Sequence, residues 1–317
     1  KIIKSNILQD RIIWLDNLKA FGILAVILGY IATPLGFFIY SWHMPLFFFL
    51  AGLLIKHELT TKQFILKDFK RLMLPYFVFA LVALILETVK RIILNRDGLN
   101  YVDEIKGIFI WMDYGSLINT YGFVLWFLPA LFFARILVFF LNKFTKTFLI
   151  KTAIIIFLFY LSFNLNIIFA IDNALNAVVF VFIGSVYFRL VENDRWLGAF
   201  PFLLLGLIYS LGIPGLDLSS KYYENVPINI LYSISIIFTF ILIIKKINYE
   251  NKLLSLWGSN TMLLFVIHPY TNNIGHIIVE KIHFGDWYLK FFISLFILQG
   301  VLIIKKKYIG RGIFNYV

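Results

Sequence analysis

The chain has 317 residues, of which 61% are hydrophobic, 19% are aromatic and only 15% are charged. Soluble domains average about 45–50% apolar and about 25% charged residues, so this composition excludes a soluble globule and indicates an integral membrane protein. The chain has no cysteine, which excludes disulfides and thiolate metal sites, and its net charge of +12 follows its membrane topology and does not indicate nucleic-acid binding.

The long apolar runs predict an all-α fold, a bundle of membrane-spanning helices. They show no period-2 alternation, which excludes a membrane β-barrel. Because a helix needs about 20 mostly apolar residues to cross the hydrocarbon core, about ten spans are expected. The second of them could extend upstream through Trp42 or downstream past Lys56, and the longest polar connection, 95–122, is expected to lie partly on the bilayer surface. The expected spans are residues 18–37, 44–55, 74–94, 123–141, 149–165, 168–188, 198–213, 226–244, 254–271 and 287–304.

The distribution of Lys and Arg predicts the orientation of these spans. With the N-terminus in the cytoplasm, 21 of the 29 basic residues fall on the cytoplasmic side, among them Lys1, Arg195 and Arg311, and seven fall outside. This bias predicts ten transmembrane helices with both termini cytoplasmic, in the inner membrane. No cleaved signal peptide, repeat or soluble appendage is apparent, so residues 1–317 are expected to form a single transmembrane domain.

The first span contains two polar residues on one helix face. Lys19 and Tyr30 are eleven positions apart, which returns them to nearly the same face about 16 Å apart along the axis. One interpretation is a lysine at the inner surface and a phenol near mid-membrane that serve one function. The other is a snorkelling lysine and a packed aromatic residue.

The next segment, SWHMPLFFFLAG, places His43 beside Trp42 near the outer end of the second span. His43 is a catalytic candidate or an interfacial residue at a helix start. After this span, Lys67, Lys70 and Arg71 cluster just before a Leu-Pro pair. They are the positive-inside signal of this span or a phosphate-binding patch at its cytoplasmic end.

Three further polar residues fall within later spans. Ionisable groups in the hydrocarbon are costly, so Arg135 and Asp172 are functional candidates, and Arg135 requires a carboxylate, a phosphate or a watery cavity. His268 precedes Pro269 at the end of a late span, where a histidine is either structural or catalytic. No phosphate loop, zinc-ligand spacing or dinucleotide glycine fingerprint is present, and no metal is expected.

Taken together, five stretches resemble the acyltransferase-3 family of bacterial membrane proteins, in particular its fucose-4-O-acetylase-like sugar O-acetyltransferases. The family opens with an Arg or Lys eleven positions before a histidine, and has a His-Met-Pro-Leu-Phe-Phe segment and ten core helices. The matching stretches cover nearly the whole chain in order and are RIIWLDNLKAFGILAVILGY, HMPLFFFLAG, KDFKRLMLPYF, LWFLPALFFARIL and GSNTMLLFVIHPY.

The resemblance implies transfer of an acyl group, usually acetyl from acetyl-CoA, to a hydroxyl of a cell-surface sugar. The acceptor would be a lipid-linked glycan or a growing lipopolysaccharide or capsule chain. Trp42, Arg135 and Asp172 are expected to contact it. The phosphates of coenzyme A would be held at the cytoplasmic mouth by four cations, Lys19, Lys67, Lys70 and Arg71.

One position departs from the family pattern, because the expected catalytic histidine of the first helix aligns with Tyr30. A phenol with an ordinary pKa of about 10 does not readily accept a proton from a sugar hydroxyl. Three explanations follow: the substitution inactivates the enzyme, a cation such as Arg135 activates the phenol, or His43 or His268 supplies the base. The rival functions are a transporter or flippase of a lipid-linked sugar and a catalytically inactive relative.

Overall fold

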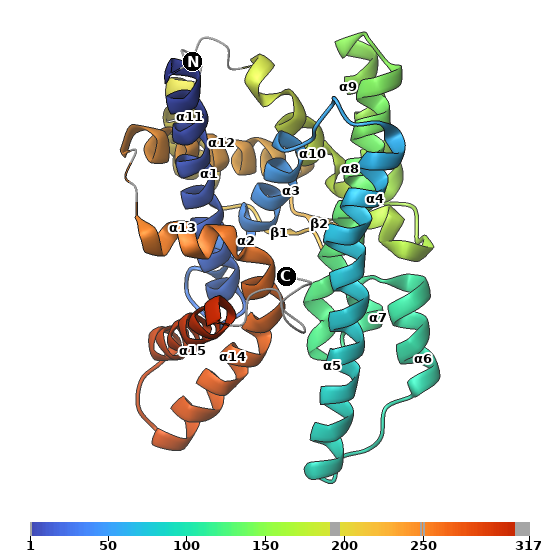
Figure 1. Cartoon of the computed structure of the whole chain (residues 1–317), viewed down its shortest axis with the longest axis vertical. Coiled ribbons are helices and arrows are strands. Elements are labelled where there is room, and N and C mark those ends of the chain that lie inside the picture. Colours follow the sequence, from blue (N-terminus) through green and yellow to red (C-terminus); the bar gives the residue numbers. More distant parts are fainter. Residues whose placement is uncertain (1, 191–196, 248, 250, 308–317) are drawn as a thin grey trace. The chain divides into compact units, whose positions relative to one another are not determined.

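The computed structural model describes residues 2–190, 197–247, 249 and 251–307, without the side chains of 2–12 and 190, and these residues are almost entirely helical (Figure 1). Lys1, Arg195 and Arg311, assigned above to the cytoplasmic side, and the C-terminal end lie outside the described residues. The chain divides into two compact units. Unit 1 comprises Lys1–Phe47, Arg189–Leu216 and Tyr223–Phe314, and unit 2 comprises Phe48–Phe188, Asp217–Tyr222 and Asn315–Val317.

Unit 1 is built around the first helix and the C-terminal helices. Its described helices are α1 (Ile2–Gly29), α2 (Gly36–Tyr40), a 3-10 turn (Leu197–Ala199), α11 (Phe200–Leu211), α12 (Val226–Ile247), α13 (Lys252–Ser259), α14 (Thr261–Ile282) and α15 (Trp287–Lys307). The boundary with unit 2 falls within α3 (His43–Leu53). A short two-stranded sheet, β1 (Leu216–Asp217) and β2 (Tyr222–Tyr223), also lies at this boundary.

Unit 2 contains the middle of the chain. Its described elements are α4 (Thr61–Asp68), the π-helix η1 (Phe69–Met73), α5 (Leu74–Ile93), α6 (Tyr101–Lys106), the π-helix η2 (Gly107–Trp111), α7 (Tyr114–Leu117), the 3-10 helix η3 (Tyr121–Trp126), α8 (Phe127–Phe144), α9 (Phe148–Ser162), the 3-10 turn η4 (Ile168–Ala170) and α10 (Ile171–Leu190). The last two residues of α10 belong to unit 1.

The protein is an all-α membrane protein apart from the short hairpin. Among the described residues, six helical stretches are long and apolar enough to cross a bilayer. Two shorter apolar helices, Phe148–Ser162 and Leu197–Leu211, coincide with further expected spans. The count of ten spans and the cytoplasmic termini stay predictions. The six stretches are Gly36–Leu53, Thr61–Ile93, Tyr121–Phe144, Ile168–Arg189, Val226–Ile247 and Trp287–Lys307.

The first expected span, 18–37, was wrong at its C-terminal end. Helix α1 stops at Gly29, and a non-helical segment leads to the start of α2 at Gly36. Pro34 explains the break, because the residue before a proline is disfavoured in the helical region and proline has no N–H to donate. The second expected span does extend upstream, since α2 and α3 together form one apolar stretch.

The ninth expected span, 254–271, was wrong at both ends. A break at Asn260 separates α13 from α14, and α14 continues through Pro269 to Ile282. Proline does not end this helix because its neighbours satisfy the backbone carbonyl that it leaves without a donor, as described below.

The third expected span, 74–94, coincides with α5, but the helix begins thirteen residues earlier. Helices α4, η1 and α5 run in line as one helical stretch of 33 residues (Figure 1). Thr60 starts it with a capping box, in which its hydroxyl accepts from the Gln63 N–H and the Gln63 side chain accepts from the Thr60 N–H. A helix of this length is about 50 Å long, longer than the roughly 30 Å hydrocarbon core, so one end projects from it.

Close glycine contacts fix the helix packing within each unit. In unit 1, a Cβ placed on Gly258 of α13 would lie 2.0 Å from the Asp16 carbonyl oxygen of α1. In unit 2, a Cβ on Gly184 of α10 would lie 1.9 Å from the Phe49 carbonyl oxygen of α3. Only glycine permits backbones to approach so closely.

Candidate active site

Unit 1 gathers the three expected catalytic residues into one cluster. The ring centres of Tyr30 and His268 are 5.0 Å apart, and those of Tyr40 and His43 are also 5.0 Å apart. Tyr30 and Tyr40 join the two pairs at 6.4 Å. We call these four residues the histidine–tyrosine cluster. Sequence reasoning missed Tyr40, which ends α2 three residues before His43 begins α3.

His268 owes its orientation to the proline that follows it. Pro269 has no N–H, so the Phe265 carbonyl four residues earlier lacks its usual helical donor. The His268 imidazole takes that place, since its Nδ1 lies 2.6 Å from the Phe265 carbonyl oxygen. A carbonyl only accepts hydrogen bonds, so Nδ1 carries the proton, and Nε2 of the neutral ring has a free lone pair.

Nε2 of His268 accepts no hydrogen bond from any residue that the structure describes. His268 is fully buried, and Nε2 has no hydrogen-bond partner among the described residues. Buried polar atoms are nearly always paired, and an exception needs an explanation. A buried imidazole whose tautomer is fixed and whose acceptor nitrogen is unpaired beside a phenol has the form of a general base that awaits a hydroxyl.

A backbone carbonyl also fixes the tautomer of His43 on α3. Its Nδ1 lies 2.8 Å from the Ile39 carbonyl oxygen and therefore also carries the proton. Pro45 leaves the Ser41 carbonyl without a helical donor, and the Ser233 hydroxyl of α12 donates to it at 2.5 Å. The His43 side chain is 1% exposed.

Tyr30 lies at the first position beyond α1. Its backbone N–H still donates to the Val26 carbonyl at 3.3 Å, so the phenol projects from the last turn of the helix. Lys19, which shares this helix, forms a 3.0 Å ion pair with Asp16 and keeps 20% of its side chain exposed. Lys19 therefore lies on α1, and Tyr30 directly follows its end.

Trp42 is enclosed among aromatic rings of unit 1. Its ring stacks on Phe21 at 5.5 Å and meets the edge of Phe240 at 4.8 Å. The side chain is 1% exposed, and its Nε1 donor has no hydrogen-bond partner among the described residues. Direct contact with a sugar, as expected from the sequence, would require the rings that cover Trp42 to move.

Unit 2 carries the basic patch, which comprises Lys67, Lys70 and Arg71 on α4 and η1. All three side chains are exposed. They lie on the part of the long helix that precedes α5, and the last two belong to the π-helix Phe69–Met73. Short π-helical segments occur often at functional sites.

A buried ion pair lies beneath this patch. Arg135 of α8 donates from Nε to Asp68 Oδ2 at 2.7 Å and from Nη2 to Asp68 Oδ1 at 3.3 Å. Its Nη1 donates to the carbonyl of Ala51, near the end of α3. Arg135 is thus already paired with a carboxylate, one of the three environments expected for it. Sequence reasoning missed Asp68, which lies inside the segment read only for its basic residues.

The comparisons with known proteins agree with this chemistry. A family model described as an acyltransferase domain, that of acyltransferase family 3, matches residues 12–305. The chain belongs to this family. No curated protein and no solved structure matches the chain. The match covers parts of both units, and it supports a membrane acyltransferase.

Asp172 of this acyltransferase lies in a second internal ion pair. The Lys221 ammonium donates to Asp172 Oδ2 at 2.5 Å and to the carbonyls of Leu165 at 2.7 Å and Ser162 at 3.3 Å. Within unit 2, these hydrogen bonds connect α9 and α10 to the 217–222 segment. The contacts favour a structural role for Asp172, and its expected contact with substrate stays a prediction.

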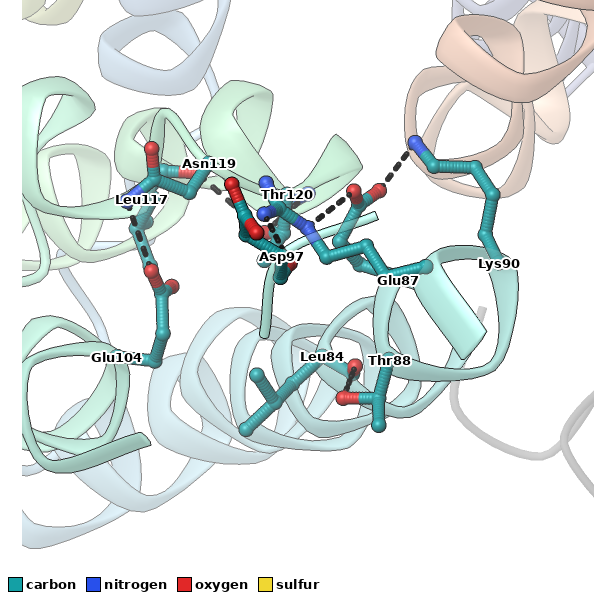
Figure 2. A network of polar contacts seen from close by, with 11 residues as sticks. Leu84, Glu87, Thr88, Lys90, Asp97, Glu104, Leu117, Asn119 and Thr120 are labelled. Carbon is teal, nitrogen blue, oxygen red and sulfur yellow. Dashed lines mark hydrogen bonds and ion pairs between the residues drawn. The ribbon is translucent and has the colours of Figure 1, made fainter. Parts of the chain in front are cut away.

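The polar connection 95–122 of the acyltransferase folds onto the end of α5. Glu87, only 4% exposed, pairs with Lys90 and, at 3.0 Å, with Arg91, and Arg91 reaches the Asp97 carbonyl at 3.0 Å. Figure 2 shows Glu87 pointing toward Lys90, with Asn119 directed at Glu104. Glu87 therefore anchors the connection that follows α5.

No cluster of three or more metal-ligating side chains occurs in the described part of the acyltransferase. The donor set of the histidine–tyrosine cluster is two imidazoles and two phenols, and both imidazoles already use Nδ1 to hold backbone carbonyls.

Proposed function

We propose that this acyltransferase lies in the inner membrane and transfers an acyl group from acyl-CoA to a hydroxyl of a cell-surface glycan or its lipid-linked precursor. The proposed acyl group is acetyl. We further propose that His268 is the general base. The observation that carries this assignment is the unpaired, buried Nε2 of His268 beside Tyr30, in a ring whose tautomer the Phe265 carbonyl holds.

The proposed reaction is a direct transfer. His268 Nε2 takes the proton of the acceptor hydroxyl as its oxygen attacks the thioester carbonyl carbon. The C–S bond then breaks, and the coenzyme A thiolate leaves and takes the proton from the imidazolium. The products are the O-acyl ester and free coenzyme A. The proposed role of the Tyr30 hydroxyl is to donate a hydrogen bond to the oxyanion.

The basic patch of unit 2 is the proposed donor site, and the expected contribution of Lys19 stays a prediction. Coenzyme A carries several phosphate charges, and exposed cations at a membrane surface attract such a polyanion. The projecting length of the α4–α5 helix supports this assignment, because it carries Lys67, Lys70 and Arg71 beyond α5. Replacing both Lys70 and Arg71 by Gln should weaken acetyl-CoA binding, more at low salt than at high salt. The matched control is Lys106→Gln, another exposed lysine of unit 2.

One observation favours a second candidate, a catalytically inactive relative. Tyr30 stands where the family is expected to have its catalytic histidine, and a phenol cannot serve as a base near neutral pH. Such a chain would still bind its ligands but would not turn over.

The test is release of labelled acetate from acetyl-CoA by the purified chain in detergent. Wild type, His268→Gln, His43→Gln and Tyr30→His are compared with His276→Gln, a histidine of α14 whose side chain is 49% exposed. Loss of a general base costs about 10²–10⁴-fold in rate, so we expect such a drop in His268→Gln and wild-type rates in His276→Gln.

The other outcomes separate the alternatives. Turnover only in Tyr30→His would favour the inactive relative. A loss in His43→Gln with full activity in His268→Gln would transfer the role of base to His43. No turnover in any variant, with no binding of acetyl-CoA, would overturn the enzyme assignment and favour a transporter of a lipid-linked sugar.

A further inference from the structure

A buried polar network adjoins the histidine–tyrosine cluster within unit 1. It consists of Thr271 and Asn272 on α14 and Ser294 on α15, whose exposed fractions are 2%, 7% and 0%. The Thr271 and Ser294 hydroxyl oxygens are 2.7 Å apart, and the Ser294 hydroxyl donates to Asn272 Oδ1 at 2.7 Å. We call these three residues the α14–α15 network.

The donors of this network point in one direction. Because the Ser294 hydroxyl gives its proton to Asn272, Ser294 can only accept from Thr271. Asn272 accepts through Oδ1 and donates through Nδ2 to the Ile27 carbonyl of α1 at 2.9 Å. At the other end, the Thr271 hydroxyl oxygen is 3.1 Å from the His268 carbonyl oxygen. With its proton given to Ser294, Thr271 does not donate to that carbonyl, and the network joins Thr271 of α14, through Ser294 of α15 and Asn272, to the backbone of α1.

The Ile27 carbonyl needs this donor because α1 ends there. In a continuing helix the N–H of Ile31 would donate to Ile27, but it donates instead to Leu28 at 3.0 Å. The Asn272 amide supplies the missing hydrogen bond from another helix. It thus caps the last turn of α1, immediately before Tyr30.

We propose that Asn272 is a positioning residue of the acyl-transfer site. By capping Ile27, it holds the end of α1 so that Tyr30 faces His268, and Ser294, with Thr271, holds the amide in the orientation that makes this bond. The inference rests on the proposed function where it treats the Tyr30–His268 pair as the reacting site. Asparagine suits the position because it offers an acceptor and a donor at once, whereas an aspartate lacks the donor.

The test compares Asn272→Ala with Asn273→Ala, its half-buried neighbour on α14. Both are made in the full chain in detergent, and acetyl-CoA hydrolysis is measured alongside the thermal unfolding midpoint. We expect kcat to fall at least tenfold in Asn272→Ala with the KM for acetyl-CoA within twofold, and Asn273→Ala to stay within twofold of wild type in both. Equal kcat in the two variants, or a loss expressed only in KM, would overturn the proposal.

A second readout does not depend on turnover. In chains labelled with 15N-histidine, the His268 signal is identified by its loss in His268→Gln. It should shift in Asn272→Ala and stay in place in Asn273→Ala. Should the wild-type chain neither turn over nor bind acetyl-CoA, the proposed function fails while this signal still decides whether Asn272 positions the pair.

Ser294→Ala provides a second test of the proposal in case Asn272→Ala does not fold. It leaves the Asn272–Ile27 bond possible and removes only the hydroxyl that orients the amide. A shift of the same His268 signal with a several-fold loss of kcat is expected in the folded protein. An unchanged signal and rate would contradict the proposed support of Asn272.

Discussion

The Asp68–Arg135 pair places two charges inside unit 2, where their side chains are only 3% and 6% exposed. Burial of one charge without its partner is costly, while the pair is tolerated because two hydrogen bonds join the groups and the Ala51 carbonyl takes a third donor. The pair also links the end of α4, which carries Lys67 and leads directly into η1, to α8 and the end of α3. Its role in the acyltransferase is therefore to fix the segment that presents the proposed donor-binding cations.

Removal of either partner should destabilise the protein strongly. Breaking a buried pair typically costs about 3–5 kcal/mol, because the remaining charge stays buried. We expect Arg135→Leu and Asp68→Leu each to lower the thermal unfolding midpoint in detergent, and the double variant to recover much of the loss. The control is Lys67→Leu, a substitution of the exposed residue next to Asp68, and it should change the unfolding midpoint little. Additive losses in the double variant would contradict a coupled pair.

At the residue scale, the kind of partner that a buried charge requires was predictable from the sequence. The expectation that Arg135 requires a carboxylate, a phosphate or a watery cavity is met by Asp68. The partner itself was not predictable, because it lies 67 positions away in a segment whose most visible feature is its positive charge. Which carboxylate reaches a guanidinium depends on helix packing, and a single sequence does not encode that distance in any local pattern.

At the scale of elements, α3 and α10 depend on glycine at their contact. A Cβ on Gly52 of α3 would lie 1.9 Å from the Val181 carbonyl oxygen, and one on Gly184 would lie equally close to Phe49. The two helices thus approach each other reciprocally through their backbones. Helices in membranes use small residues in this way because van der Waals packing replaces the hydrophobic drive.

An alanine at Gly184 should therefore separate the two helices. Overpacking of this kind costs about 1–3 kcal/mol, and more where a backbone atom is struck, since backbone cannot turn aside as a side chain can. We expect a clear fall of the unfolding midpoint in Gly184→Ala. Gly206→Ala on α11, where a Cβ would meet nothing within 4 Å, is the control and should be neutral or slightly stabilising. Equal midpoints in the two variants would argue against the close contact.

Two prolines show when a helix end can be predicted from the sequence and when it cannot. Pro34 ends the helical region after α1, but Pro269 lies inside α14 without ending it. The difference is whether another group satisfies the freed carbonyl. At Phe265 the His268 ring does so, and that contact was not apparent from the proline alone.

At the scale of the whole molecule, composition predicted a membrane protein and the long apolar runs predicted an all-α fold, and six long apolar helices among the described residues bear this out. The family followed from five short stretches in the correct order, and the match over residues 12–305 confirms it. The candidate site was predicted as single residues. That Tyr30 and His268, 238 positions apart, would come together depended on the packing of α1 against α14, which no local pattern contains.

The predicted topology is testable because the chain has no cysteine of its own. Lys62 and Lys106 are both exposed and lie on either side of the third expected span. In intact cells, a membrane-impermeant maleimide should label Lys106→Cys directly and Lys62→Cys only after permeabilisation. The unmodified chain is the control and should take no label. The reverse labelling pattern would show that the orientation is opposite to the predicted one. Labelling of both variants in intact cells would show that no membrane span lies between positions 62 and 106.

The His268–Pro269 pair has a consequence for how this protein can change. An alanine at position 269 would provide the N–H that the Phe265 carbonyl lacks, and α14 would gain a backbone hydrogen bond and a better helix former. The imidazole would then lose its anchor and exchange freely between its two protonation isomers. With His268 in its proposed role as the base, Pro269→Ala should therefore raise stability and lower the rate of acyl transfer in a single substitution.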